Sequence, residues 1–99
     1  LDIWDFCFET HWSAETPADF SCDVNRGDPE DDSFILNHFL TNPLASPDLA
    51  ELVNHNPYFL NRAATCQGAN EHIVNYPTVD FYDVGDIFDV VDALNGVAP

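Results

Sequence analysis

The clearest hydrophobic pattern lies in the C-terminal third of the chain. Residues 77–82 are rich in β-branched and aromatic side chains, which favour an extended strand. A turn follows at Asp83 and Gly85. Apolar side chains then recur with the spacing of one helical face, at Ile87, Phe88, Val90, Val91 and Leu94. Asn95 and Gly96 are typical of a helix end. The pattern predicts a strand, a short loop and a helix, which form one unit of an α/β barrel or a doubly wound sheet.

Two further strands are expected upstream. Residues 2–10 alternate bulky apolar positions with small or acidic ones. One face of this strand would carry Trp4, Phe6 and Phe8, and the other Asp5, Cys7 and Glu9. Residues 33–40 form a continuous apolar run, which is typical of a strand covered on both faces. Asn37 and His38 stand near the C-terminal end of that run.

The rest of the chain predicts helices and loops in a single unit over residues 1–99. Helices are expected over residues 48–54 and about 57–66, with Ser46 as N-cap and Pro47 in the first helical position. The connecting loops are residues 11–33, 41–47 and 67–75. The predicted order is β, loop, β, α, α, β, α, an α/β fold that holds too few units to close a barrel.

The charge of the chain limits the classes of molecule that it is expected to bind. It has 18 acidic residues against two basic ones, and its net charge is −16. Without a cationic surface, binding to nucleic acid or to anionic membranes is not expected. No transmembrane run or signal peptide is visible, and the chain starts within an apolar run without Met, as a processed or truncated product would. An acidic secreted protein is the simplest interpretation.

The three cysteines fit that interpretation. None is part of a CxxC pair, so a structural zinc site is not expected. In an exported chain one disulfide is plausible, and we expect it between Cys22 and Cys66. Cys7 is then left over, as a buried thiol or as a bond to another chain.

Several acidic side chains are candidates for chemistry. Asp80 and Tyr82 would share one face at the end of the last strand, where they can orient a substrate hydroxyl or a catalytic histidine. The alternative is that Asp80 only hydrogen-bonds neighbouring segments. Glu9 ends the first strand in the same way, with an exposed loop carboxylate as the alternative.

Histidines and an acidic loop offer weaker candidates. His38 is a candidate general base or metal ligand, and a hydrogen-bonded structural histidine is the alternative. His11, His55 and His72 fall in predicted loops or helix ends. The acidic run Asp28, Glu30, Asp31 and Asp32 can bind Ca²⁺ in principle, but its order does not match an EF-hand, so a solvated loop is favoured. No other cofactor is expected.

The two arginines stand out because they are so few. Each is expected to anchor a loop by pairing with a carboxylate. For Arg26, a role in binding a substrate phosphate is the alternative. Arg62 lies in the second predicted helix.

Four short motifs follow one another along nearly the whole chain. They are Phe8-Glu9-Thr10 with Cys22-x-x-x-Arg26, Ile35-Leu36-Asn37-His38-Phe39-Leu40, Arg62-Ala63-Ala64-Thr65-Cys66, and the strand and helix of residues 77–95. In this order and spacing the chain resembles fungal secreted proteins related to phosphatidylinositol-specific phospholipase C. It departs from their pattern at Thr10-His11-Trp12, where the family favours Thr-Pro-Phe.

The resemblance implies a partial TIM-like (β/α) barrel. This chain would be its C-terminal part, with about three strands and three helices, completed by another chain. In the family, two histidines on early strands perform the acid and base steps of phosphodiester cleavage. Those strands would precede Leu1, and none of the four histidines here maps onto them.

The expected function is therefore a subunit or fragment of a secreted phosphodiesterase-like protein that is inactive alone. Its substrate-binding residues around the barrel mouth would be Glu9, Arg26, His38, Asp80 and Tyr82. A second chain would supply the missing strands and histidines, with Cys7 as a candidate link. The alternative is a non-catalytic fungal binding or defence protein, lectin-like or a toxin subunit, on the same scaffold.

Overall fold

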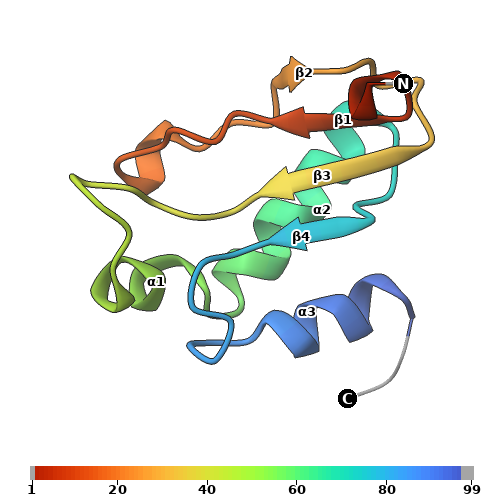
Figure 1. Cartoon of the computed structure of the whole chain (residues 1–99). Coiled ribbons are helices and arrows are strands. Elements are labelled where there is room, and N and C mark those ends of the chain that lie inside the picture. Colours follow the sequence, from red (N-terminus) through yellow and green to blue (C-terminus); the bar gives the residue numbers. More distant parts are fainter. Residues whose placement is uncertain (1, 97–99) are drawn as a thin grey trace.

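A computed structural model describes residues 2–96 as a four-stranded mixed sheet with three α-helices (Figure 1). The strands are β1 (Cys7–Thr10), β2 (Val24–Arg26), β3 (Ser33–Asn37) and β4 (Tyr76–Thr78), in the spatial order β2-β1-β3-β4. β1, β3 and β4 are parallel, and β2 pairs antiparallel with β1. The α/β class is confirmed, with one strand more than the sequence predicts.

The helices begin and end close to their predicted positions. They are α1 (Pro47–Val53), α2 (Tyr58–Asn70) and α3 (Ile87–Leu94), and two short 3₁₀ turns, η1 (Ile3–Asp5) and η2 (Pro17–Asp19), precede them. Ser46 caps α1 as predicted, because its hydroxyl oxygen accepts a hydrogen bond from the Leu49 amide at 3.2 Å. α2 extends to Asn70, so the predicted loop over residues 67–75 is wrong in its first part.

The N-terminal strand is shorter than predicted. Residues 3–5 form the 3₁₀ turn η1 because Asp2 caps it, accepting a hydrogen bond from the Trp4 amide at 3.1 Å. Only residues 7–10 are extended, and Phe6 is exposed whereas Phe8 is completely buried. The predicted alternation therefore holds only within β1.

The predicted loop over residues 11–33 contains a strand that the sequence did not reveal. β2 has three residues and lies at the edge of the sheet, with Arg26 opposite Glu9 and Val24 opposite Thr10. Such a short edge strand has no room for a periodic hydrophobic pattern. Its position is fixed by pairing with β1, which is a tertiary contact.

The last strand also ends earlier than predicted. β4 stops at Thr78, and residues 79–86 form an irregular loop in which Phe81 adopts a left-handed conformation with φ of 53°. The buried side chain of Asn54 holds this loop, since its Nδ2 donates to the carbonyl oxygens of Asp80 and Val84 at 3.0 and 3.1 Å. These bonds replace ladder hydrogen bonds that a longer strand would need.

The hydrophobic core lies between the sheet and the two longer helices. Phe8, Phe34 and Leu36 point from the sheet, and the rings of Phe8 and Phe34 stack at 4.5 Å. α2 contributes Phe59, Ala63 and Cys66, and α3 contributes Ile87 and Val90. All helical hydrophobic packing in this cluster is on one face of the sheet.

The opposite face of the sheet carries no α-helix within residues 2–96 (Figure 1). Strand register places there the residues that alternate with the core positions, namely Cys7, Glu9, Arg26, Ile35, Asn37, Tyr76 and Thr78. Tyr76 is 57% exposed, and Ile35 is partly exposed. We call this the open face of the sheet. None of the described helices is long and apolar enough to cross a membrane.

Candidate functional site

A cluster of polar side chains surrounds Glu9 on the open face, where β1 and β3 end. Glu9 is only 4% exposed, and both of its carboxylate oxygens accept hydrogen bonds. Oε2 accepts from Arg26 Nε at 2.7 Å and from Asn25 Nδ2 at 2.9 Å, and Oε1 accepts from Asn37 Nδ2 at 3.0 Å. We call Glu9, Asn25, Arg26 and Asn37 the Glu9 cluster.

Sheet geometry explains why these four residues meet. β2 and β3 flank β1, so Arg26 pairs directly with Glu9 from one side, and Asn37 ends the strand on the other side. The side-chain amide of Asn37 also donates to the Thr10 carbonyl oxygen at 2.8 Å, which ties the ends of β1 and β3 together. Burial alone would raise the pKa of Glu9, but hydrogen bonds from Arg26, Asn37 and Asn25 outweigh it and lower the pKa below its usual value.

Arg26 is held in a fixed orientation, although only one of its nitrogens is hydrogen-bonded. Nε pairs with Glu9, and the guanidinium lies 4.2 Å from the ring centroid of Trp4. The side chain is 50% exposed, and no described residue accepts a hydrogen bond from its terminal nitrogens. The predicted carboxylate partner of Arg26 is confirmed, and the free end of the guanidinium can bind an anion.

His38 follows β3 but is not at the surface. It is completely buried, with Nε2 2.7 Å from the Val53 carbonyl oxygen and Nδ1 3.0 Å from Arg62 Nη1. These contacts assign the neutral tautomer, in which Nε2–H donates and Nδ1 accepts. Burial lowers the pKa of His38 to about 4, and the nearby Arg62 charge acts in the same direction. His38 therefore takes the structural role that was the alternative, and it cannot reach a substrate in this arrangement.

The sequence predicted Asp80 and Tyr82 on one face of a strand, but the structure does not place them on a strand. Both lie in the loop after β4, where Asp80 is half-buried and Tyr82 is 67% exposed. Tyr82 meets the ring of Phe88 edge-on at 6.4 Å. Within residues 2–96, no hydrogen bond joins either side chain to the Glu9 cluster.

His55, His72 and the acidic loop are engaged in contacts within the chain, and His11 is exposed. His55 pairs with Glu51 at 2.8 Å, and His72 Nε2 lies 2.9 Å from the Asp31 carbonyl oxygen. In the acidic loop, Asp28 and Asp31 accept hydrogen bonds from loop amides. Within residues 2–96 no group of three or more His, Cys, Asp or Glu side chains is arranged to hold a metal ion.

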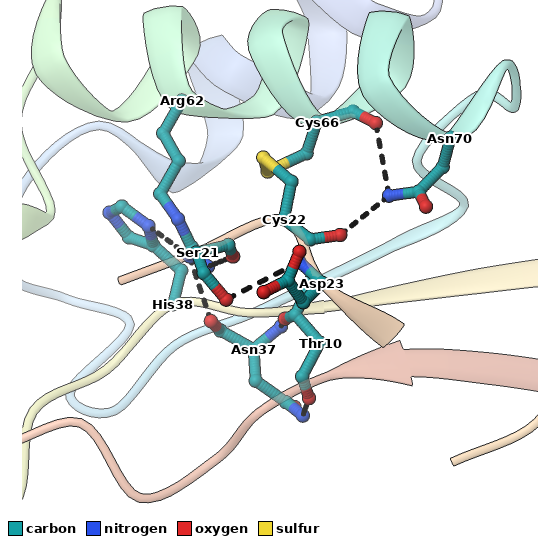
Figure 2. Close-up of a disulfide and its surroundings, with 9 residues drawn as sticks. All are labelled: Thr10, Ser21, Cys22, Asp23, Asn37, His38, Arg62, Cys66 and Asn70. Carbon is teal, nitrogen blue, oxygen red and sulfur yellow. Dashed lines mark hydrogen bonds between the residues drawn. A yellow bond between two sulfur atoms is a disulfide. The ribbon is translucent and has the colours of Figure 1, made fainter. Parts of the chain in front are cut away.

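The predicted disulfide is confirmed. Cys22 and Cys66 are bonded, which fastens the segment before β2 to α2 (Figure 2). Asn70 reinforces this link, because its Nδ2 donates to the carbonyl oxygens of Cys22 and Cys66 at 2.9 and 3.3 Å. Cys7 has a free thiol, is partly buried and lies on the open face of the sheet.

Arg62 is the residue whose role sequence analysis missed. No carboxylate of the described chain pairs with it, so the predicted ion pair is wrong for Arg62. It donates instead to the carbonyl oxygens of Asn37 and Ser21, each at 2.8 Å. The one available signal was its position in a helix whose neighbours are apolar or small.

Comparisons with protein-family models, with curated proteins and with solved structures gave no significant match. The resemblance to phospholipase C-like proteins therefore stays a prediction from motifs. Any function must be argued from the geometry of the Glu9 cluster and its surroundings.

Proposed function

We propose that this chain is one part of a secreted phosphodiesterase-like α/β barrel, and that Arg26 binds the substrate phosphate at the barrel mouth. A second chain would supply the remaining strands and the catalytic acid and base. In this proposal the isolated chain binds phosphate esters weakly and does not cleave them.

The sheet supports the barrel part of this proposal. β1, β3 and β4 run parallel, the helices cover only one face, and the open face presents partly exposed side chains such as Ile35 and Tyr76. The three parallel strands share this arrangement with a barrel wall, which has helices outside and the other face packed inside, whereas the antiparallel β2 has no counterpart in an all-parallel barrel. Both edges of the sheet, β2 and β4, are unpaired among the described residues, and a second chain would cover them.

The orientation of Arg26 is the observation that carries the phosphate part. Glu9 holds Nε, Trp4 stacks on the guanidinium, and the terminal nitrogens remain unbonded at a half-exposed position. Arginine with two free nitrogens matches the paired oxygens of a phosphodiester. The site lies at the carboxyl ends of parallel strands, where α/β folds place their ligands.

The chemistry divides between this chain and its partner. Glu9 is a positioning residue, since both of its oxygens are occupied and its lowered pKa keeps it ionised. Arg26 would neutralise charge on the phosphoryl oxygens. In cleavage next to a hydroxyl, that hydroxyl attacks phosphorus while a base takes its proton, and an acid protonates the departing alcohol. Among residues 2–96 no histidine side chain hydrogen-bonds a side chain of the Glu9 cluster, so in this proposal both groups would come from the partner.

A native mass measurement on material from its source tests the barrel part. We expect a second chain that brings the total near about 250 residues, a typical barrel length. Loss of the second chain upon reduction would assign Cys7 as the link, since it is the free thiol on the open face. A mass equal to one or more copies of this chain alone would refute the two-part barrel.

Titration with a soluble phosphodiester tests the role of Arg26. We expect Arg26→Gln to weaken binding by at least about tenfold, because a charge-assisted contact is lost. Ala69→Glu is the matched control, as it changes net charge by the same amount at an exposed position of α2. Equal affinity of the Arg26→Gln variant and the unmodified chain would remove the phosphate assignment.

A non-catalytic binding or defence protein is the second candidate. One observation favours it, because His38 is buried and neutral and so is not available as an acid or base at the surface. It predicts phosphate or sugar binding at the open face without hydrolysis, even with the partner present. Hydrolysis by the complete assembly would exclude this candidate.

The proposed location outside the cell rests on two properties. The Cys22–Cys66 disulfide needs an oxidising compartment to persist, and the chain has a net charge of −16 without any lysine. Free-thiol counting on freshly isolated protein tests this. One reactive thiol per chain is expected, or none if Cys7 links the chain to its partner, and three would contradict the proposed location.

A further inference from the structure

A pocket lies between α2 and the segment of residues 17–22. Its volume is about 260 Å³, and its lining includes Phe20, Ser21, Tyr58, Asn61, Arg62 and Thr65. It shares no residue with the Glu9 cluster. The disulfide fixes one of its walls, because Cys22 also lines it and is bonded to Cys66 of α2 (Figure 2).

Arg62 brings a buried positive charge to this pocket. The residue is only 9% exposed, and its side chain reaches from α2 toward Asn37 and His38 (Figure 2). Its guanidinium carbon lies 4.1 Å from the ring centroid of Phe20. Burial lowers the pKa of Arg62 to about 10, which still leaves it protonated at neutral pH.

The charge of Arg62 has no carboxylate partner among residues 2–96, although the chain has 18 acidic residues. Its protein contacts are two carbonyl oxygens and a neutral imidazole. Nη1 makes two of these contacts and Nη2 one, so Nε–H and one Nη2 proton lack a protein acceptor in the described chain. A buried charge without a counter-ion is costly, and a bound anion would remove that cost.

We propose that this pocket binds a small organic carboxylate, with its acid group at Arg62 and its apolar body against Phe20 and Tyr58. Two remaining N–H donors match the two oxygens of one carboxylate. The aromatic walls favour an apolar body, and the volume suits a small ring or a short aliphatic chain. A phosphate dianion would bring more negative charge than one arginine compensates, into a chain with a net charge of −16.

Benzoate is the probe that we would use first, with benzamide as its neutral counterpart of the same shape. Titrations would use the disulfide-bonded chain together with any chain that copurifies. We expect saturable benzoate binding and at least about tenfold weaker benzamide binding, because the amide lacks the charge that pairs with Arg62. Equal affinity for the two probes would overturn the proposal.

Substitutions on α2 test whether benzoate binds in this pocket. Thr65→Phe fills the pocket from an exposed helix position, and we expect it to weaken benzoate binding at least about tenfold. Ala64→Phe adds the same side chain at the neighbouring exposed position outside the pocket and should leave the affinity unchanged. Equal benzoate affinity of the Thr65→Phe variant and the unmodified chain would overturn the proposal.

A measurement without any substitution keeps the proposal testable if a variant does not fold. In amide NMR spectra of the unmodified chain, benzoate should shift resonances of residues 17–22 and of α2 around Arg62. Shifts centred on Arg26 and Glu9 would show that the carboxylate binds at the other arginine, and would refute the pocket assignment. Inorganic phosphate should leave the residues around Arg62 unshifted at the same concentration.

Discussion

Reduction of the Cys22–Cys66 disulfide should destabilise this domain strongly. The two cysteines are 44 residues apart in sequence. Closing a loop of that length in the unfolded chain corresponds to about 4 kcal/mol of stabilisation in the chain-entropy model. Because a domain of this size has a total stability of roughly 5–15 kcal/mol, the bond accounts for a large share.

The structure adds a local reason for this sensitivity. The disulfide joins the segment before β2 to α2, and the contacts of Asn70 with Cys22 and of Arg62 with Ser21 depend on that alignment. Without the bond, segment 17–22 keeps these hydrogen bonds and the packing of Phe20, which stacks on Arg62 and His38. We therefore expect it to open before the rest of the sheet does.

Urea unfolding with and without a phosphine reductant measures the effect. The background should be Cys7→Ser, because the free thiol could exchange with the disulfide during unfolding. We expect the free energy of unfolding to fall by about 4 kcal/mol, with a larger m-value, since the reduced unfolded chain exposes more surface. A loss below about 1 kcal/mol would refute the loop-closure argument for this bond.

Three further predictions address single residues. Glu9→Gln should lower the free energy of unfolding in urea by about 2 kcal/mol, because it removes the buried charge that pairs with Arg26. A loss near zero would contradict the geometry of the cluster. Because the folded pKa of His38, about 4, lies below its unfolded value, the unfolded state binds the extra proton between pH 6.5 and 4. As the pH falls through that range, the free energy of unfolding should therefore drop by about 3 kcal/mol more in the unmodified chain than in the His38→Gln variant. Parallel pH profiles of the two proteins would disprove this effect of His38. Gly85→Ala should cost about 1–3 kcal/mol in thermal unfolding, because Gly85 has φ of 88° and a Cβ there would collide with the Asn54 backbone, and an unchanged melting temperature would contradict this.

The predictable parts of this fold are those with strong local signals. The apolar stripe of α3 and the Ser46-Pro47 start of α1 follow from helix periodicity and capping, which depend on neighbouring residues only. A disulfide was expected from the composition, although three cysteines allow three pairings and composition alone does not select Cys22–Cys66. Phe34 and Leu36 were predictable as a buried strand from their apolar run.

The parts that could not be predicted depend on contacts between distant segments. β2 exists because Arg26 and Val24 pair with β1, and β4 ends early because Asn54, from the segment between two helices, takes the carbonyl groups of the following loop. His38 looked like a surface base because its sequence position ends a strand. Tertiary packing places it in the interior, where the ring of Phe59 stacks on it at 4.0 Å.

The Glu9 cluster was predictable in half of its members. Glu9 and Arg26 were recognised, the former from its place at a strand end and the latter from its rarity. Asn25 and Asn37 complete the cluster as amide donors. Asparagine also occurs at many loop positions, so its presence in the sequence does not indicate this role. Asp80 and Tyr82 were expected on one strand face because the predicted strand ran to residue 82, whereas β4 ends at Thr78.

The placement of the two arginines also determines where trypsin-like proteases can cut this protein. These enzymes cut after lysine or arginine, and the sequence offers them only the bonds after Arg26 and Arg62. The first follows a strand paired with β1, and the second lies inside α2 with a buried side chain. The bond after Arg62 is therefore protected, whereas Arg26 and Gly27 are both exposed where β2 ends. Cleavage after Arg62 must wait for local opening of α2, so its rate relative to cleavage after Arg26 would report the loosening of that helix.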